Sequence, residues 1–267
     1  MQNGRDHTAW CHQTETAMTI EETLALITRY TRDYIDRFDS ARLGELETFT
    51  LTDLLDRADP FLLRTANRGM AHDVIASILD AHFAFAREEP FGQFLEGLAI
   101  YVAEVTSEGH KSSTEGLDLE LTREGVRYLV AIKSGPHWGN HSQYNDLRLR
   151  FRAAVHVLKQ SSQTASVQPV LGICYGKFKT VNNGEYLKLG GQSFWHFVSG
   201  FPTLYMDMVE PIGYEAQKHD ARYLLEKSSA YNRFTRDLIA EFCNPQGQID
   251  WAKLVRFNSG NLPAARG

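Results

Sequence analysis

Several features that define other classes of protein are missing from this chain of 267 residues. It has no apolar run of about eighteen residues, so no transmembrane helix is predicted. The first thirty residues lack the basic start and apolar centre of a signal peptide, and we therefore expect a cytoplasmic location. The three cysteines are far apart and lack C-x-x-C spacing, which excludes a disulfide framework and a zinc ribbon. Glycine-rich phosphate loops and internal repeats are also absent.

Positive charge is scarce overall but concentrated in one segment. The net charge of the chain is −5. Between Arg123 and Lys188, ten basic residues stand against three acidic ones, so this segment carries +7 and the remainder −12. An acidic average can conceal a local positive field that attracts a polyanion. Nucleic acid therefore stays among the partners to be weighed.

The N-terminal third is predicted to be helical after a loose polar arm over residues 1–18. Thr19 and Glu22 form the T-x-x-E pattern of a capping box, and apolar residues at helical spacing follow it. We predict a helix from about 20 to 38. Further helices are predicted over residues 50–57, from about 70 to a stop before Pro90, and from 91 to about 105.

The pattern changes to period two at GLDLELT, which with the turn REG and the run VRYLVAIKSG predicts a β-hairpin. A loop, a helix from about 143 to 160 and the buried strand VQPVLGICYG follow. The remainder is mostly helical, and Asp250 is expected to cap a last short helix. This order predicts an α/β fold of the α+β type, with a mixed central sheet flanked by helices on both faces, a largely helical N-terminal region and a C-terminal tail.

The hairpin brings an acid and a lysine into the same region. Asp118 lies on its first strand and Lys133 at the end of its second, about one strand spacing apart if the register pairs them. Mg²⁺ prefers oxygen ligands and keeps several waters, so a few carboxylates and a substrate phosphate suffice. Such a metal beside an ammonium group suits phosphodiester hydrolysis. The alternative is a plain cross-strand ion pair. Lys133 interrupts the apolar run YLVAI, which favours the catalytic interpretation.

These stretches resemble the PD-(D/E)XK type II restriction endonucleases, most closely the group related to PmeII. The matching stretches, over about residues 59 to 215, are DPFLLRT, FGQFLEGLAIYV, GLDLEL…GVRYLVAIKSGPHWGNHSQ, GICYGK and GQSFWHFVSG. The resemblance implies a restriction-endonuclease-like core in which Asp118 and Lys133 are the motif residues. It also implies that Glu96, from a helix, joins the metal site.

The sequence departs from the family pattern at one position. Ala131 stands where an Asp or Glu is expected, two residues before Lys133. Glu96 could supply the missing oxygen from its helix, Glu120 could do so from the strand, or the protein could be a catalytically inactive relative. We favour Glu96, because FLEG stands at the matching place in the resembling sequences. Ile132 could add a backbone carbonyl.

The resemblance also implies domain organisation and DNA contacts. We expect a single nuclease domain over residues 19–245, helical at 19–90, with a catalytic core at 91–212 and helices at 213–245, before a tail over 246–267 with a short helix. Arg148 and Arg152 lie four apart and so share one side of their helix, although a solvated helix face is the alternative. The residues expected to contact DNA are Ser134, His137, Asn140, His141, Gln143, Arg148, Arg152, Lys177, Lys179, Asn182 and Asn183.

The two histidines and the two asparagines of this list, and also Trp138, have a competing interpretation. His137 and His141 could form a zinc pair, but no third ligand stands at suitable spacing. Asn182 and Asn183 have the amide geometry that pairs with adenine, and Asn-Asn-Gly is also a turn signal. Trp138 is expected to be a packing anchor, with base stacking as the alternative.

The expected function is that of a type II restriction endonuclease. It would cleave double-stranded DNA at a palindromic site as a homodimer, with Mg²⁺ or in its place Mn²⁺, and leave 5′-phosphate and 3′-hydroxyl ends. No membrane partner is expected, and a cognate DNA methyltransferase is expected in the same system. The alternatives are a structure-specific or repair nuclease on the same core, a non-catalytic DNA-binding relative and a structural protein that does not bind DNA.

Overall fold

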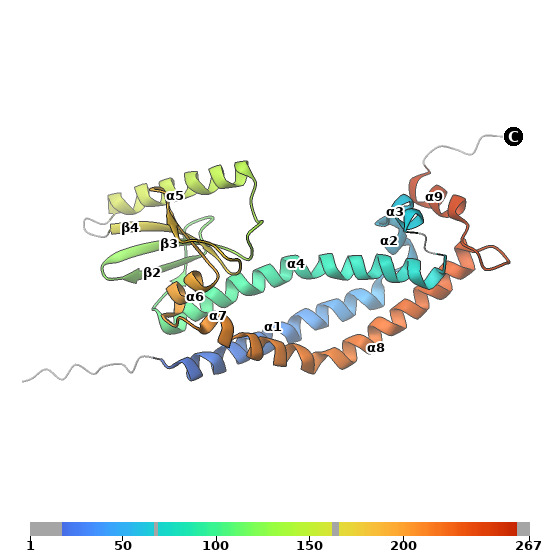
Figure 1. Ribbon diagram of the computed structural model, residues 1–267, viewed down its shortest axis with the longest axis horizontal. Helices are drawn as coiled ribbons and strands as arrows, with labels where there is room; N and C mark the ends of the chain where they lie inside the picture. Colours follow the sequence, from blue (N-terminus) through green and yellow to red (C-terminus); the bar gives the residue numbers. More distant parts are fainter. Residues whose placement is uncertain (1–17, 67–68, 162–165, 261–267) are drawn as a thin grey trace, which may run out of the picture. The chain divides into compact units, whose positions relative to one another are not determined.

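The computed structural model describes residues 18–66, 69–161 and 166–260 (Figure 1). The predicted arm lies outside these residues except for Met18. The chain divides into two compact units, which are described in turn. The first comprises Met1–Leu26, Ala99–Ile132 and Gly139–Met206, and the second Ile27–Leu98, Lys133–Trp138 and Asp207–Gly267. None of the helices that the structure describes combines the length and the apolar character needed to cross a membrane.

The first unit is built on a mixed sheet, as predicted. Its six strands within the described residues run in the order β1-β2-β3-β4-β6-β5. Pairs β1–β2, β2–β3 and β5–β6 are antiparallel, whereas β4 and β6 are parallel. The bounds are β1 His110–Lys111, β2 Leu119–Arg123, β3 Val126–Lys133, β4 Ser166–Ile173, β5 Val181–Asn182 and β6 Leu187–Gly190. Strands β1, β5 and β6 were not predicted, because two to four residues are too few to show a period.

The predicted hairpin is confirmed as β2 and β3, with Leu119 paired to Val130. Glu124 and Gly125 form its turn, with positive φ values of 51° and 74°. Two successive positive φ angles are typical of a tight type I′ turn, whose twist matches that of the strands. Residues 129–132 are all buried, on both faces of β3, because β3 is an interior strand of the sheet and helices cover both faces of the sheet (Figure 1).

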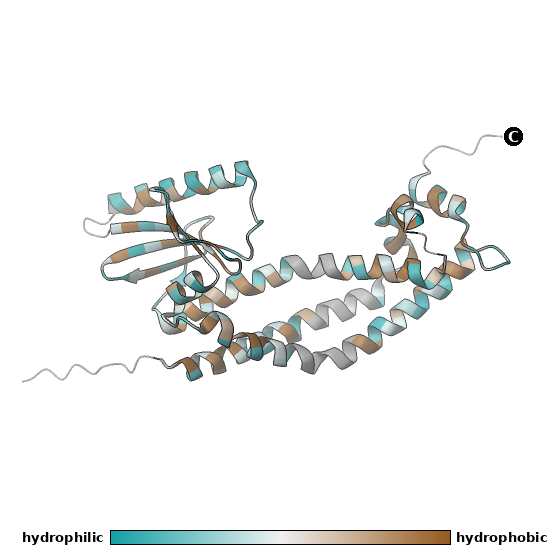
Figure 2. Cartoon of the chain, in the orientation of Figure 1, coloured by the Kyte–Doolittle hydropathy of each residue, from teal (hydrophilic) through white to brown (hydrophobic). Residues whose placement is uncertain are grey.

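Helices cover both faces of this sheet (Figure 1). Helix α5 (His141–Ser161), which confirms the predicted helix, packs along β4 and buries Leu147, Phe151 and Ala154 at helical spacing. Helix α6 (Gln192–Ser199) packs on β6. The Phe194 ring of α6 rests directly on Gly172 of β4, where any side chain would overlap it. Figure 2 shows apolar residues along the strands beneath these helices.

The second unit is helical, as predicted for the N-terminal third and for the region after β6. The helices of the chain outside the sheet region are α1 (Ile20–Thr48), α2 (Leu51–Asp56), α3 (Pro60–Thr65), α4 (Ala71–Thr106), α7 (Leu204–Asp207), α8 (Val209–Phe242) and α9 (Trp251–Ser259). A shared hydrophobic core joins α2, α3, the first part of α4, the end of α8 and α9. Val74, Ile75 and Leu238 in this core are completely buried.

The predicted helix starts are confirmed at two capping residues. Thr19 N–H donates to Glu22 Oε2 at 2.8 Å, and Glu22 N–H donates to Thr19 Oγ1 at 3.2 Å, which completes the capping box of α1. Asp250 Oδ1 accepts from Lys253 N–H at 2.9 Å and caps α9. Both caps involve residues only three apart, so the sequence displays them directly.

Two predicted helix ends were wrong, and helix α3 was not predicted. Helix α4 continues through Pro90 instead of ending before it, and α1 extends to Thr48 instead of about residue 38. Pro60 begins α3 at its first turn, where proline is tolerated because its missing N–H would be unpaired anyway. At Pro90 the neighbouring helix contributes: Tyr34 of α1 donates to the Pro90 carbonyl at 2.6 Å, and its ring lies 4.6 Å from that of Phe94. Tertiary contacts therefore outweigh the local penalty of proline.

Candidate active site

Asp118 is bound to β3 by both its backbone and its side chain. Its N–H donates to the Val130 carbonyl at 2.9 Å, and its carboxylate Oδ2 accepts from Ile132 N–H at 2.6 Å. The side chain is half-buried. A carboxylate has about four lone-pair sites, so the hydrogen bond from Ile132 orients the group without occupying all of them. The hairpin thus brings the predicted Asp to Ile132, the residue that precedes Lys133.

Lys133 is the last residue of β3, and its ammonium group lies over an aromatic ring. Its Nζ is 5.6 Å from the centroid of the Trp138 ring. This distance is within the range of a cation–π interaction, which extends to about 6 Å. Both side chains are half-buried. The cation that lies over the Trp138 ring is therefore the candidate catalytic lysine.

Glu96 lies on the face of α4 that approaches the loop after Lys133. A Cβ atom at Gly92 would be 3.2 Å from Ser134 Oγ, so the helix and the loop are in close contact there. Glu96 follows Gly92 by four residues and so occupies the same helix face. The Glu96 side chain is half-buried. Glycine at 92 permits this approach, since a larger side chain would have to displace Ser134.

Glu120, the other acid considered as a metal ligand, is engaged in a buried ion pair. Its side chain is 2 % exposed, and Oε2 accepts from Arg127 Nε at 2.9 Å and from Arg127 Nη2 at 2.5 Å. Oε1 accepts from Ser112 Oγ at 2.7 Å. Burial alone would raise the pKa of Glu120, but the hydrogen bonds from Ser112 and Arg127 and the charge of Arg127 outweigh it and hold the pKa below 4.5. These contacts join β2, β3 and the segment before β2.

Ala131 is 1 % exposed, between Val130 and Ile132, which are completely buried. Among the residues that the structure describes, no group of three or more His, Cys, Asp or Glu side chains is arranged to hold a metal ion. A metal site made of two carboxylates and a backbone carbonyl has only two such side chains and would not form a group of three.

One family model matches the chain, that of the type II restriction endonuclease EcoO109I, over residues 25–220. The chain belongs to this family. It is therefore a deoxyribonuclease that cleaves double-stranded DNA at specific sites, and the expected enzyme class is confirmed. Glu96, Asp118 and Lys133 all lie within the matched residues. No curated protein sequence matches the chain.

Two residues of this endonuclease that were predicted to contact DNA form the capping box of α5. Asn140 N–H donates to Gln143 Oε1 at 2.9 Å, and Gln143 N–H donates to Asn140 Oδ1 at 3.1 Å. Both carboxamide oxygens thus accept hydrogen bonds from backbone N–H groups at the start of α5. Any DNA contact of these two side chains would therefore be made by their NH₂ groups. His137 and His141 are exposed near this cap, and Ser134 is half-buried.

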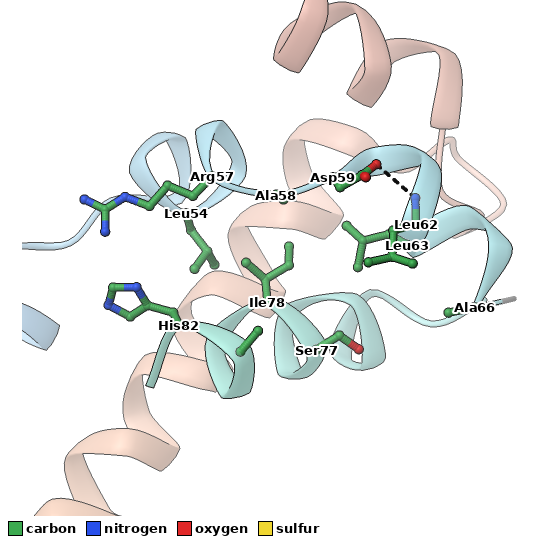
Figure 3. A pocket seen from close by; sticks show the side chains of 11 residues that line it. Leu54, Arg57, Ala58, Asp59, Leu62, Leu63, Ala66, Ser77, Ile78 and His82 are labelled. Atoms are coloured by element: carbon green, nitrogen blue, oxygen red, sulfur yellow. Dashed lines mark hydrogen bonds between the residues drawn. The ribbon is translucent and has the colours of Figure 1, made fainter. Parts of the chain in front are cut away.

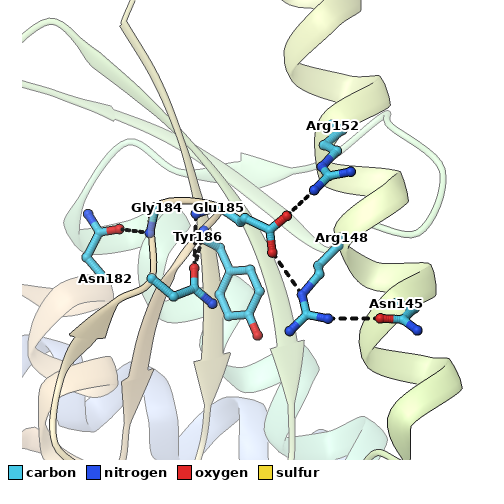
Figure 4. A network of polar contacts seen from close by, with 8 residues as sticks. Asn145, Arg148, Arg152, Asn182, Gly184, Glu185 and Tyr186 are labelled. Atoms are coloured by element: carbon cyan, nitrogen blue, oxygen red, sulfur yellow. Dashed lines mark hydrogen bonds and ion pairs between the residues drawn. The ribbon is translucent and has the colours of Figure 1, made fainter.

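The two arginines expected to face DNA share one carboxylate of the same protein (Figure 4). Arg148 Nε lies 2.9 Å from Glu185 Oε2, and Arg152 forms an ion pair with Glu185 Oε1. Arg148 also donates to Asn145 Oδ1 at 2.8 Å. Glu185 lies between β5 and β6, so the cluster fastens this turn to α5. In the EcoO109I-family chain, both guanidinium groups are therefore partly neutralised.

Arg150, which is not among the predicted DNA contacts, lies in a different place from Arg148 and Arg152. Its guanidinium group and side-chain stem lie against Gly116, where a Cβ atom would meet Arg150 Nη1 at 2.5 Å. Gly116 has φ +77° and precedes Asp118 by two residues. Within the described part of the chain, Arg150 has no carboxylate partner. Sequence spacing alone could not distinguish it from its two neighbours, because the distinction depends on where Gly116 and Glu185 lie.

Asn182 and Asn183 use their side-chain oxygens to shape the turn between β5 and β6. Asn182 Oδ1 accepts from Gly184 N–H at 3.0 Å, and Asn183 Oδ1 accepts from Tyr186 N–H at 2.9 Å (Figure 4). The turn interpretation is therefore confirmed for both oxygens, while both side chains remain exposed.

The predicted DNA contacts Lys177 and Lys179 are exposed on either side of Phe178. The Phe178 ring packs against Gly176 and Gly190, and Lys188 Nζ lies 4.8 Å from its centroid. This aromatic anchor holds the backbone between the two lysines in place.

A pocket of about 660 Å³ lies in the second unit, between α2, α3 and α4 (Figure 3). Its walls are mostly apolar, and none of the predicted site residues lines it. Its one carboxylate, Asp59, accepts from Phe61 N–H at 2.9 Å and Leu62 N–H at 3.0 Å as the cap of α3. The pocket is thus a feature of helix packing, with its acid already engaged.

Proposed function

We propose that the protein is a Mg²⁺-dependent type II restriction endonuclease whose metal is held by Asp118, Glu96 and the Ile132 carbonyl. The observation that carries this proposal is the hydrogen bond from Ile132 N–H to Asp118 Oδ2. It orients a half-buried carboxylate beside the strand end that carries Lys133. Asp118 and Glu96 supply hard oxygen donors, which suit Mg²⁺ and also Mn²⁺. When bound, the metal would polarise the scissile phosphate and lower the pKa of a bound water.

The chain's own residues would position the reactants. The Lys133 ammonium donates hydrogen bonds, so it can orient the attacking water and balance charge that develops on the phosphate oxygens. The water oxygen forms a bond to phosphorus while the bond from phosphorus to the 3′ oxygen breaks, and that oxygen leaves as a hydroxyl after protonation. The products are 5′-phosphate and 3′-hydroxyl ends.

Glu96 takes the place of the acid that residue 131 lacks. Its helix face approaches Ser134, directly after Lys133. Glu120 is the weaker candidate, because Arg127 and Ser112 already bind both of its oxygens. A non-catalytic relative is the second candidate function, and the buried Ala131 is the observation that favours it. Binding of DNA without turnover over a range of Mg²⁺ and Mn²⁺ concentrations would support this second function.

Phosphate contacts are proposed for the exposed cations Arg150, Lys177 and Lys179. Arg148 and Arg152 would also contact phosphate once their ion pairs with Glu185 are broken. Ser134, His137 and His141 would contact DNA at the border of the site. Base contacts would come from the amide groups of Asn140, Gln143, Asn182 and Asn183, whose NH₂ groups can donate to base edges. We also propose that the protein belongs to the PmeII-related subgroup and acts as a homodimer whose two-fold axis matches a palindromic site. It would be cytoplasmic, and a cognate DNA methyltransferase would belong to the same system.

The test is digestion of a plasmid of mixed sequence with and without Mg²⁺, followed by sequencing of the ends. Discrete fragments with 5′-phosphate ends, and no cutting in EDTA, are expected. Random smearing, or equal cutting in EDTA, would overturn site-specific metal-dependent cleavage. Lys133→Ala should abolish cutting while DNA binding persists.

A further inference from the structure

We propose that Trp138 is a positioning residue that holds the Lys133 ammonium group in its reactive place. The inference rests on the proposed function, in which Lys133 is the catalytic lysine. The juxtaposition that carries it is the 5.6 Å distance between Lys133 Nζ and the centroid of the Trp138 ring. Trp has the most favourable ring face for a cation among the aromatic side chains.

A lysine needs such support more than other catalytic cations do. Its ammonium group ends a flexible four-carbon stem, and an unsupported stem samples many rotamers. Lys133 is half-buried at a strand end, so its Cα atom is held by the sheet while its ammonium group is not. The indole face limits the positions that Nζ occupies without consuming the N–H donors that a water or a phosphate requires. An acidic partner would hold the lysine too, but it would compete with the phosphate for the same charge.

The loop around Trp138 is restrained on both sides. Ser134 is packed against Gly92 of α4, and Pro136 fixes its own φ angle. Directly after Trp138, Gly139 lies so close to the Tyr144 ring that a Cβ atom would be 3.2 Å from Cε2. The capping box of Asn140 and Gln143 then fixes the start of α5. A ring in a restrained loop can hold a flexible side chain, whereas a ring in a mobile loop could not.

The test is a graded series, Trp138→Tyr, Trp138→Phe and Trp138→Leu, in the full-length protein. Single-turnover cleavage rates in Mg²⁺ should be highest with Trp at position 138, lower with Tyr or Phe, and lowest with Leu. Trp138→Leu should be about tenfold to a hundredfold slower than the unaltered protein, because small misplacements of a reacting group have costs of this size. The Kd for the same DNA in EDTA should stay within about twofold, because a positioning residue acts on the reaction rather than on binding.

Trp251→Leu is the matched control. Trp251 also lies under a cation, Arg64, at 5.5 Å from the ring centroid to Cζ, but it belongs to α9. Its loss should lower the unfolding midpoint and leave the cleavage rate of the folded protein unchanged. An equal fall of the cleavage rate in Trp138→Leu and Trp251→Leu would show that the rate depends on any half-buried tryptophan, and this outcome would overturn the inference.

A second measurement does not depend on activity. Reductive methylation with ¹³C-formaldehyde places NMR-visible methyl groups on Lys133 Nζ, and Lys133→Arg identifies their signal. The indole ring current should shift this signal upfield, and Trp138→Leu should return it to the position of the exposed lysines. An unshifted Lys133 signal in the unaltered protein would show that the contact is absent and would overturn the inference.

The two hypotheses fail in different ways. Normal cleavage by Lys133→Ala would remove the proposed catalytic role of the lysine itself. Loss of cleavage in Lys133→Ala together with a normal rate in Trp138→Leu would leave that role intact and overturn the role of Trp138. A Phe variant as slow as the Leu variant, with an equal fall in thermal stability, would reduce Trp138 to a packing residue.

Discussion

At the level of single side chains, the proposed metal site depends on an acid that strand β3 does not provide. Ala131 is buried in β3, and the Asp118 carboxylate accepts a hydrogen bond from the amide of Ile132, the residue after Ala131. A single carboxylate holds Mg²⁺ weakly, because the ion takes several oxygen ligands. Glu96 is the half-buried acid on the helix face that meets the loop after Lys133.

Glu96→Gln should therefore lower the cleavage rate at least about a hundredfold at a fixed Mg²⁺ concentration, because a neutral amide replaces a charged ligand. The apparent Mg²⁺ requirement should rise as well. Glu104→Gln is the matched control, since Glu104 is an exposed acid on the same helix. A normal rate in Glu96→Gln, measured on a cleavable plasmid, would exclude Glu96 as a ligand.

Glu120 should contribute to stability in a pH-dependent way. In the folded protein the pKa of Glu120 lies below its ordinary value of 4.5, and that ordinary value applies to the unfolded chain. The contribution is therefore complete above about pH 4.5 and is lost as the pH falls through the folded pKa. Glu120→Gln should lower the free energy of unfolding at neutral pH by about 1 to 2 kcal/mol. This is less than the cost of breaking a fully buried ion pair, because solvent screens the exposed part of Arg127. Urea unfolding from neutral to acidic pH checks this, and an unaltered pH profile would contradict it.

At the level of helices and strands, Glu185 connects the β5–β6 turn to α5 through Arg148 and Arg152. The carboxylate bridges the two guanidinium groups, with one oxygen on each arginine. The same two groups are proposed to contact DNA phosphate, which would compete with Glu185 for them.

Glu185→Gln should raise the affinity for non-cognate DNA about threefold to tenfold, because two cations lose an internal competitor. Asp146→Asn is the control: it is an exposed residue on α5 and changes the net charge equally. Fluorescence anisotropy with labelled duplex at several salt concentrations measures the difference. Equal affinities for the two variants would show that Glu185 does not compete with phosphate.

Helix α4 carries the cost of an interior proline. Pro90 has no N–H to donate within the helix, and its ring crowds the preceding turn. Pro90→Ala should raise the free energy of unfolding by about 1 to 3 kcal/mol. The bond from Tyr34 to the carbonyl of residue 90 is retained in this variant, because it involves the backbone. A lower urea midpoint than that of the unaltered protein would contradict the expectation.

For the protein as a whole, the charge is divided along the sequence. The segment from Arg123 to Lys188 carries +7 while the remainder carries −12. DNA binding by such a protein should weaken steeply with salt, because each phosphate contact releases counterions. The double variant Lys177→Ala, Lys179→Ala should lower the slope of log K against log salt by about 1.8, since each contact accounts for about 0.9. Lys253→Ala, outside the segment, should leave the slope unchanged.

Local signals made much of the fold predictable. The hairpin, the α5 helix and the caps at Thr19 and Asp250 depend on residues that are neighbours in the sequence, and all were predicted. The errors lie where distant residues act. Pro90 stays helical with Tyr34 packed beside it, 56 residues away, and β5 and β6 are strands only because the sheet provides partners for them.

The candidate site divides in the same way. The hairpin pattern suggested Asp118 and Lys133 as candidate site residues, and the resemblance to the PD-(D/E)XK endonucleases added Glu96. Only the tertiary structure decided which groups those residues contact. The Asp118 carboxylate meets the amide of Ile132, and Glu185 neutralises Arg148 and Arg152 rather than Arg150. Contacts that span from 14 to 37 residues leave no period or spacing in a sequence, since they form only when strands and helices have packed.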